Sequence, residues 1–300
     1  MNDLVTIIMP LNNAITYINE SIETVKQQSY KNFELLIIKT NTHVNIDKII
    51  NFHSKNDSRI RIITKKTKNI ENLKNIGIKE SKGEFICFME AGDKLEKEYI
   101  TKLKAIQNKT KADIISSELI IDKKNTKSKK INIYKNNEIM EAYVNLKIRS
   151  NAKGKLFKKE LFNEIEYPVS AYDNFLITYQ IFHKCQKLVH TDLKLYKYIP
   201  EKNERISDKE HMKKLEGCLE MLNFIEKNYQ YLSKKFNTKL CFEAIDLTKK
   251  MKKEENKKYL FEYIKLYRKY AILDIRIKPS LRLEAVKSLL GYNLFKMCIK

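Results

Sequence analysis

Two acidic residues follow an apolar run in the first third of the chain. Gly83 begins the segment GEFICFMEAGDKL, in which five apolar or nearly apolar residues lead directly to Glu90, with Asp93 close behind. An unbroken apolar run bounded by Gly83 and Gly92 is typical of a buried strand in a parallel sheet, although a buried helix segment has the same pattern. Ligands of open α/β sheets bind just beyond the carboxyl ends of such strands. The two carboxylates are therefore candidates for ligand binding, and ordinary solvated loop positions are the alternative.

The residues before this segment alternate between strand and helix patterns. A β-branched run over residues 5–9 is expected to be a strand stopped by Pro10, and a loop from Pro10 to Asn13 then leads into an amphipathic helix. Further strands are predicted over residues 33–38 and 60–63 and in the apolar run after Gly83, with helices over residues 46–53 and 70–80 between them. Each parallel crossover needs a helix on a face of the sheet. The pattern predicts an α/β fold with a doubly wound, mostly parallel sheet.

The composition predicts a folded chain of one or two domains. The 300 residues are 43% hydrophobic, which is enough for a sizeable core, and no stretch of about 18 uncharged apolar residues is present. No apolar signal region precedes the first strand, so we expect a cytoplasmic protein. The five cysteines are widely spaced and lack a CxxC pair, which predicts reduced thiols and argues against a disulfide framework or a zinc site.

The formal net charge of +22 is explained either by compositional drift or by binding to an anionic partner. The lysines are spread over every segment, which favours compositional drift, while attraction to anionic lipid headgroups or to a diphosphate is the functional alternative. Nucleic acid is not an expected partner, because the sequence has no RNP-like aromatic box, zinc finger or basic zipper.

Two parts of the chain resemble a known family. The segments QQSYKNFELL and NIGIKESKGEF, within residues 4–105, and GKLFKKELF, within residues 154–207, are similar to family 2 glycosyltransferases of the GT-A fold, of the bacterial surface-polysaccharide type. The resemblance implies a GT-A domain over residues 1–207, with a nucleotide-sugar half (1–110) and an acceptor half (111–207). Residues 208–300 are predicted to form a helical C-terminal region.

The resemblance also implies the chemistry. In this family a nucleoside-diphosphate sugar lies over the strand ends, and a divalent cation, Mn²⁺ or Mg²⁺, bridges its diphosphate to acidic residues. An acceptor hydroxyl, here of a glycan or a lipid-linked molecule, attacks with inversion. Alignment of the motifs makes Glu90 and Asp93 the metal ligands of this chain. Gly92 stands where the family has the aspartate that contacts the metal, which is a departure from the expected ligand set.

The residues that the resemblance assigns to nucleotide-sugar binding come from several strand ends. They are Pro10, Asn13, Lys39, Lys74, Asn75 and Glu90. Lys39 replaces the carboxylate that accepts the uracil N3 hydrogen, and an ammonium has donors but no acceptor, so selectivity for uracil is expected to be lost or changed. Lys74 stands in place of an arginine as a charge for the diphosphate, with a solvated helix lysine as the alternative.

The general base implied by the resemblance is Asp173. A carboxylate within hydrogen-bond reach of the acceptor hydroxyl can take its proton as the new bond forms. Asp173 also precedes the apolar pattern of a helix, where aspartate is a good N-cap, and one residue can serve both roles.

The last 90 residues read as helices, and the tail after Pro279 mixes apolar residues with lysine and arginine. Such a tail can lie on the anionic inner face of the plasma membrane or pack on the rest of the protein.

Two functions fit the whole sequence. The first is an active glycosyltransferase of cell-surface polysaccharide or glycoconjugate assembly, and the second is a catalytically silent GT-A subunit that acts as a scaffold for a partner glycosyltransferase.

Overall fold

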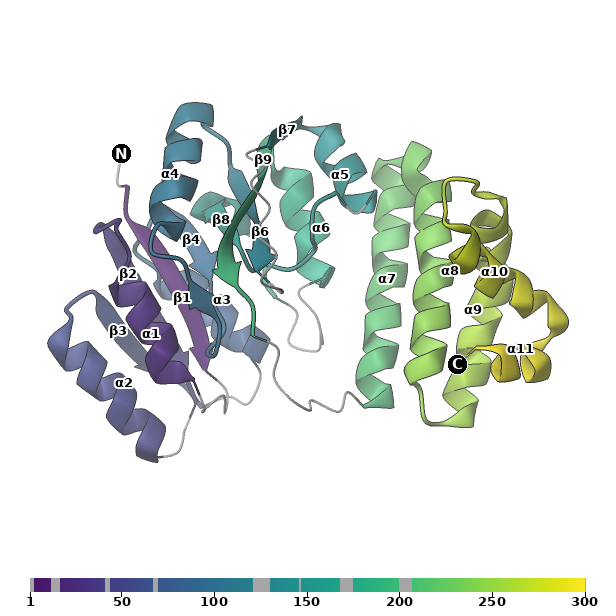
Figure 1. Cartoon of the computed structure of the whole chain (residues 1–300), viewed down its shortest axis with the longest axis horizontal. Coiled ribbons are helices and arrows are strands. Elements are labelled where there is room, and N and C mark those ends of the chain that lie inside the picture. The colour runs from purple at the N-terminus through teal and green to yellow at the C-terminus, as the bar shows by residue number, and fades with distance from the viewer. Residues whose placement is uncertain are drawn as a thin grey trace. The chain divides into compact units, whose positions relative to one another are not determined.

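The computed structural model describes residues 3–11, 17–40, 44–66, 70–120, 130–145, 147–167, 175–199 and 207–299. The chain separates into two compact units (Figure 1). The first unit consists of Met1–Tyr143, Ile148–Val169 and Ile177–Asn203, and the second contains Glu204–Lys300 with two short segments. The described cysteines Cys87, Cys185, Cys218, Cys241 and Cys298 are all free thiols.

The first unit is built on one mixed sheet. Its strands in the described residues are β1 (Val5–Leu11), β2 (Phe33–Lys39), β3 (Ile60–Thr64), β4 (Phe85–Phe88), β5 (Lys94–Leu95), β6 (Ile114–Ile120), β7 (Ile131–Lys135), β8 (Lys155–Lys158) and β9 (Lys187–Lys197). They are ordered β3-β2-β1-β4-β8-β6-β9-β5, with β7 also paired to β9. Strands β1 to β4 pair in parallel, whereas β8 runs antiparallel to both β4 and β6. The predicted α/β sheet is confirmed, with an antiparallel strand inserted at its centre.

Strand β1 is longer than the sequence pattern predicts. The expectation that Pro10 stops the strand is wrong, because β1 continues to Leu11, and Pro10 is paired in register with Ile38 of β2. The carbonyl of Ile8 accepts a hydrogen bond from the backbone N–H of Met89, so the backbone groups of Ile8 point toward β4. Backbone groups of alternate residues point the same way along a strand, so those of Pro10 also point toward β4. The ladder between β1 and β4 ends at Ile8, and the missing N–H of Pro10 therefore interrupts no ladder bond.

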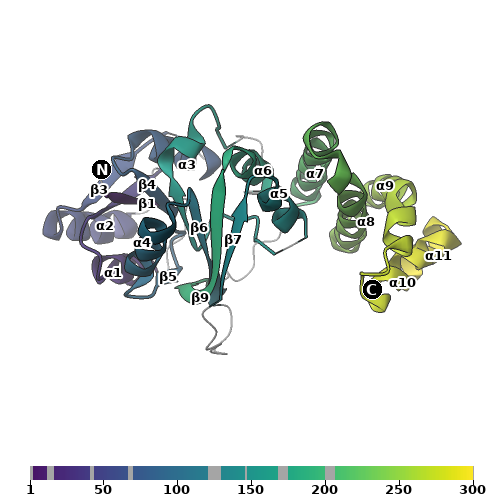
Figure 2. The ribbon, with the colours of Figure 1, turned by 90° about the horizontal axis from the view of Figure 1, so that it is seen from above.

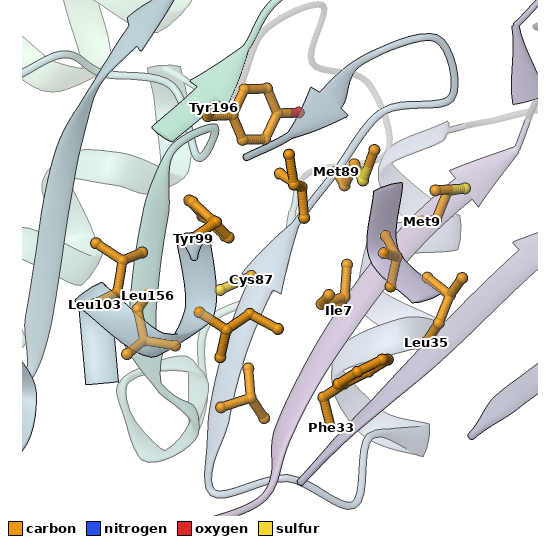
Figure 3. Close-up of a cluster of buried hydrophobic side chains, with 14 of the residues drawn as sticks. Ile7, Met9, Phe33, Leu35, Cys87, Met89, Tyr99, Leu103, Leu156 and Tyr196 are labelled. Atoms are coloured by element: carbon orange, nitrogen blue, oxygen red, sulfur yellow. The ribbon is translucent and has the colours of Figure 1, made fainter. Parts of the chain in front are cut away.

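Three helices cover one face of the sheet. Helices α1 (Ile18–Lys26), α2 (Val44–Asn56) and α4 (Tyr99–Thr110) contribute apolar side chains to a core with the alternate residues of β1, β2 and β4. Figure 2 shows these helices on one side of the strands and α3 (Ile70–Glu80) on the other. Figure 3 shows the core cluster, to which the neighbouring strands contribute Ile7, Leu35 and Cys87, with Tyr196 at its upper end.

Helix α3 lies very close to the opposite face. A Cβ added at Gly77 would be 2.4 Å from Cγ2 of Ile8 and 3.4 Å from Cγ1 of Ile38, which is too close to the first of these atoms. The glycine of the NIGIKE segment therefore allows the helix to approach β1 and β2. The described residues before position 200 also include the helices α5 (Asn137–Val144) and α6 (Phe175–Lys184) and a 3₁₀ turn at Lys159–Phe162.

The second unit is helical, in agreement with the pattern of the last 90 residues. Its described helices are α7 (Asp208–Asn228), α8 (Ser233–Lys250), α9 (Glu254–Leu273), α10 (Pro279–Lys287) and α11 (Tyr292–Cys298), with 3₁₀ turns at Gln230–Leu232 and Ser288–Leu290. A capping box of Ser207 and Glu210 begins α7. Among the helices of the described residues, none combines the length and apolar composition that crossing a membrane requires.

Candidate active site

The strand order creates a switch point between β1 and β4. The chain places β2 and β3 on one side of β1 and then crosses to place β4 on the other side. The carboxyl ends of β1, β2 and β4 lie at one edge of the sheet because the three strands are parallel. Ligands of open α/β folds bind at such a position. Strand β8 is antiparallel to β4, so it begins at this same edge, and the residues just before Lys155 reach it too.

Three charged side chains meet at this edge. The Nζ atom of Lys153 lies 2.5 Å from Oε2 of Glu90 and 3.3 Å from Oδ2 of Asp93. Its ammonium also lies 4.0 Å from the ring centroid of Tyr198, at a distance typical of a cation–π contact. The side chain of Lys153 is 11% exposed, that of Glu90 40% and that of Asp93 2%. Glu90 therefore lies at the solvent boundary, and Asp93 lies beneath it.

Both oxygens of Asp93 also accept protein hydrogen bonds. The hydroxyl of Tyr196 donates to Oδ2 at 2.6 Å, and the backbone N–H of Ile199 donates to Oδ1 at 2.8 Å. Burial raises the pKa of Asp93, and the Lys153 ammonium together with these two donors opposes that rise. Burial by itself would lower the pKa of Lys153, but Glu90 and Asp93 hold it above its ordinary value. Lys153 is thus a cation at neutral pH.

A tight turn delivers Asp93 to this place. The N–H of Asp93 donates to the carbonyl of Glu90 at 3.1 Å, and Gly92 between them has a φ of 105°, which favours glycine. The hydroxyl of Ser21 in α1 accepts from the N–H of Gly92 and donates to the carbonyl of Asp93, both at 2.8 Å. Helix α1 thereby fixes the turn, and the prediction that the segment delivers Glu90 and Asp93 from the end of a buried strand is confirmed by β4.

Lys39 lies at the end of β2 and is 8% exposed. Its Nζ atom forms an ion pair with Oδ1 of Asp47 in α2, at 2.8 Å. The residue that the motif alignment predicts to lie at the nucleotide base is thus a lysine paired with the carboxylate of Asp47.

Lys74 and Asn75 of α3 both contact Tyr167. Lys74 is buried, and its Nζ lies 5.1 Å from the ring centroid of Tyr167. The side-chain amide of Asn75 exchanges two hydrogen bonds with the backbone of the same Tyr167. The assignment of both residues, and of Pro10 and Lys39, to donor binding stays a prediction.

Two of the predicted site residues lie outside the described residues. These are Asn13, predicted to bind the donor, and Asp173, predicted to be the general base. Asn75 nevertheless holds Tyr167, which precedes Asp173 by six positions in the sequence.

Sequence reasoning missed three side chains of this site: Lys153, Tyr196 and Tyr198. Lys153 had no distinguishing signal in a chain with 59 lysines and arginines. The alternation of two tyrosines in LYKY, which places both on one face of a strand, could have indicated Tyr196 and Tyr198.

The described residues do not offer a ligand set that suits a divalent cation. No cluster of three or more His, Cys, Asp or Glu side chains occurs in the part of the chain that the structure describes. At the strand edge, Asp93 is engaged by Tyr196 and Ile199, and Lys153 contacts both carboxylates. Mg²⁺ and Mn²⁺ need several oxygen ligands, and Gly92 provides no side-chain oxygen.

The fold is an open α/β sheet with charged side chains at its switch point, and comparison with known proteins identifies the family. The family model described as "Glycosyl transferase family 2" matches residues 6–181, which is more than half of the chain. The chain therefore belongs to glycosyl transferase family 2.

Curated relatives are bacterial glycosyltransferases. Glycosyltransferase GlyG of Streptococcus pneumoniae is 22% identical over 214 residues, which cover 66% of this chain and 71% of the relative. An uncharacterized glycosyltransferase of Rickettsia bellii is 36% identical over 89 residues, 30% of this chain. The chain spans 13% of the length of the Rickettsia protein and 31% of the length of a second relative, glycosyltransferase GlyA of S. pneumoniae.

Two solved structures share the GT-A fold. S. aureus TarS (residues 1–349), crystallised with UDP-GlcNAc, superposes with a TM-score of 0.73 at 13% identity, covering 97% of this chain and 89% of that one. The mannosyltransferase PcManGT of Pyrobaculum calidifontis, in complex with GDP-Man and Mn²⁺, has a TM-score of 0.59 at 10% identity, covering 98% and 86%. The predicted GT-A fold is confirmed.

Proposed function

We propose that this chain transfers a sugar from a nucleoside-diphosphate sugar to a hydroxyl of a glycan or lipid-linked acceptor, with inversion, in the assembly of a cell-surface polysaccharide or glycoconjugate. The observation that carries the proposal is the group of Glu90, Asp93 and Lys153 at the switch point of a family 2 chain. Structural neighbours bind UDP-GlcNAc and GDP-Man, which supports a donor of the same chemical class.

The charges at the strand ends support binding of an anion. Lys39 ends β2, Lys74 lies in α3 and Lys153 precedes β8. A lysine side chain attracts a diphosphate electrostatically, and fixed charges in a partly buried site are screened less than those in open solvent. We propose that the Lys39–Asp47 pair faces the base of the nucleotide, so that the base is not selected through an acceptor for the uracil N3 hydrogen.

The attack needs a base on the acceptor side. Family resemblance gives this role to Asp173, which would take the proton from the acceptor hydroxyl while the bond to the anomeric carbon forms and the nucleoside diphosphate leaves. A positioned base of this kind contributes about 10² to 10⁴ in rate.

A donor screen tests the proposal. The chain is incubated with lipid-linked or glycan acceptors and with sugar derivatives of UDP, GDP, CDP and dTDP, and the products are detected by mass spectrometry. We expect one donor to support transfer, and Asp173→Asn to lower the rate by about 10² to 10⁴ with little change in melting temperature. Asp246→Asn, an exposed change in α8, is the matched control and should keep the wild-type rate.

The silent-scaffold alternative gives a different result in the same assay. Lys153 contacts both carboxylates of the strand edge, which is an observation in its favour. If no donor supports transfer by the chain alone, but adding it raises the rate of a partner glycosyltransferase, the scaffold function replaces the proposed one.

We also propose that the C-terminal tail places the protein at the inner face of the plasma membrane. Leu289, Leu290, Leu294 and Met297 are between 53% and 71% exposed, and lysines and arginines lie among them in the sequence. Apolar side chains flanked by cations suit an anionic lipid surface.

A further inference from the structure

We propose that Lys153 is the resident cation of the donor site and replaces the divalent cation, so that this chain binds its nucleoside-diphosphate donor without metal. The proposal rests on the proposed function, because it names how the same site holds the donor's diphosphate. It assigns a role to a residue that the family motifs do not mark.

The position of the ammonium carries the argument. Its Nζ lies within 3.3 Å of one oxygen from each of Glu90 and Asp93, which are the two carboxylates that would have to bind a metal here. A metal ion and an ammonium compete for the lone pairs of these oxygens, and the repulsion between two neighbouring cations disfavours binding both at once. An ammonium has three N–H donors, so contacts with two carboxylates leave a third for a phosphate oxygen.

The surroundings hold this lysine in place. Glu90 and Asp93 both form ion pairs with its ammonium, which also lies 4.0 Å from the ring centroid of Tyr198. Asp93 is itself held by Tyr196 and Ile199, so the pair cannot easily be rearranged into a chelate. A charge fixed by packing loses little entropy when a ligand binds, which is the advantage of a preorganised site.

The absence of a carboxylate at position 92 fits the same arrangement. The Cβ of a residue at Gly92 would meet no atom within 4 Å, so space is not what excludes a side chain. The backbone φ of 105° does disfavour one. Among the described residues, the edge thus combines the ammonium of Lys153 with the carboxylates of Glu90 and Asp93, and position 92 adds no anionic ligand for a metal ion.

Direct Mn²⁺ binding tests the proposal without any nucleotide. Free Mn²⁺ is measured by electron paramagnetic resonance during titration of the whole chain. We expect no saturable site in the wild type, and roughly tenfold or more tighter Mn²⁺ binding in Lys153→Met, which leaves Glu90 and Asp93 without their cation. Lys94→Met, which removes the neighbouring lysine that pairs with Glu20, is the matched control and should behave as the wild type.

Donor binding in chelator gives the second measurement. Calorimetry compares the affinity of the best nucleoside diphosphate in EDTA with that in Mn²⁺. We expect equal affinities for the wild type and for Lys153→Arg, which keeps a cation. For Lys153→Met we expect a loss of roughly 30-fold or more in EDTA and recovery with Mn²⁺.

The outcomes separate the two proposals. A saturable Mn²⁺ site in the wild type, or wild-type nucleotide binding that disappears in EDTA, overturns the role of Lys153 and leaves the proposed transferase intact. Failure of every nucleoside diphosphate to bind under either condition overturns the proposed function, and the role of Lys153 with it. The wild-type measurements need no variant, so a folding defect of Lys153→Met does not prevent a decision.

Discussion

Asn75 and Tyr167 are joined by a reciprocal pair of hydrogen bonds. Nδ2 of Asn75 donates to the carbonyl of Tyr167 at 2.8 Å, and the N–H of Tyr167 donates to Oδ1 of Asn75 at 2.7 Å. A side-chain amide satisfies both backbone groups of one residue in this way, as a neighbouring strand would. The contact links helix α3 to the segment that ends at Tyr167 and precedes Asp173 in the sequence.

This pair predicts a loss of stability on substitution. Asn75→Ala removes both bonds and should lower the free energy of unfolding by about 1 to 3 kcal/mol, because the N–H and the carbonyl of Tyr167 each lose a hydrogen bond. Asn75→Asp keeps the acceptor but places a carboxylate oxygen against the carbonyl of Tyr167, so its loss should be at least as large as that of Asn75→Ala. Urea unfolding measures both. Wild-type stability of Asn75→Ala combined with weaker nucleotide binding would instead favour direct donor contact by Asn75.

Gly77 is expected to be intolerant of even one methyl group. Gly77→Ala places a Cβ 2.4 Å from Cγ2 of Ile8, and such overpacking typically costs about 1 to 3 kcal/mol. A double-mutant cycle checks this cause, because Ile8→Ala removes the Cγ2 atom that the added Cβ would approach. The combined loss should then be smaller than the sum of the two single losses. Additive losses would contradict the steric explanation. Gly92→Ala is the control. It should lower the free energy of unfolding because of the positive φ at position 92, and Ile8→Ala should not reduce that loss.

The parallel half of the fold could be predicted from the sequence. Strands β1 to β4 and the helices between them are local patterns, and the apolar run before Glu90 indicated both a strand and the delivery of carboxylates to its end. The same reasoning failed at Pro10, because whether a proline interrupts a strand depends on which neighbour its nitrogen faces. That information lies in the sheet order and not in the local sequence.

The contacts of the candidate site could not be predicted in the same way. Lys153 reaches Glu90 because β8 runs antiparallel beside β4 and begins at the ligand edge. Tyr196 reaches Asp93 because β5 pairs with β9, about 100 positions later in the chain. Such long-range pairings leave no periodicity in the sequence, and a lysine at position 153 looks like any other lysine of this chain.

The exposed tail predicts salt-sensitive membrane binding. Vesicles with anionic lipid should pellet the protein at low salt, and roughly 0.5 M salt should release much of it, because the screening length falls to a few ångströms. Leu290→Ser with Leu294→Ser should weaken binding, since both side chains are more than half exposed in the tail. Phe52→Ser, which removes an exposed apolar side chain from α2, is the control. Equal binding to neutral vesicles would contradict the electrostatic part of this prediction.

Lys155 predicts a pH dependence of stability. It begins β8 and is 1% exposed, and its Nζ donates to the carbonyl of Asn151 at 2.5 Å. Burial lowers the pKa of Lys155 to about 7; the nearby Arg149 adds to this effect, and Glu118 opposes it. The folded protein therefore releases this proton near pH 7, whereas the unfolded chain keeps it until about pH 10.4.

The unfolded state thus binds more protons than the folded state between about pH 7 and pH 10, and the contribution of Lys155 to stability rises with pH over that window by up to about 1.4 kcal/mol per pH unit. Below pH 7 both states are protonated, and the full cost of burying the charge is present.

Lys155→Met removes this cost, so the variant should gain stability relative to the wild type at pH 6 to 7, and the difference should shrink as the pH rises toward 10. Chemical unfolding of both proteins at a series of pH values measures that difference, which cancels the titration of groups that the two share. Lys158→Met on the same strand is the matched control. Lys158 pairs with Glu160, which raises its pKa, so Lys158 stays protonated in both the folded and the unfolded state over this window. A constant difference between the wild type and Lys155→Met from pH 6 to pH 10 would show that Lys155 is charged in the folded protein throughout.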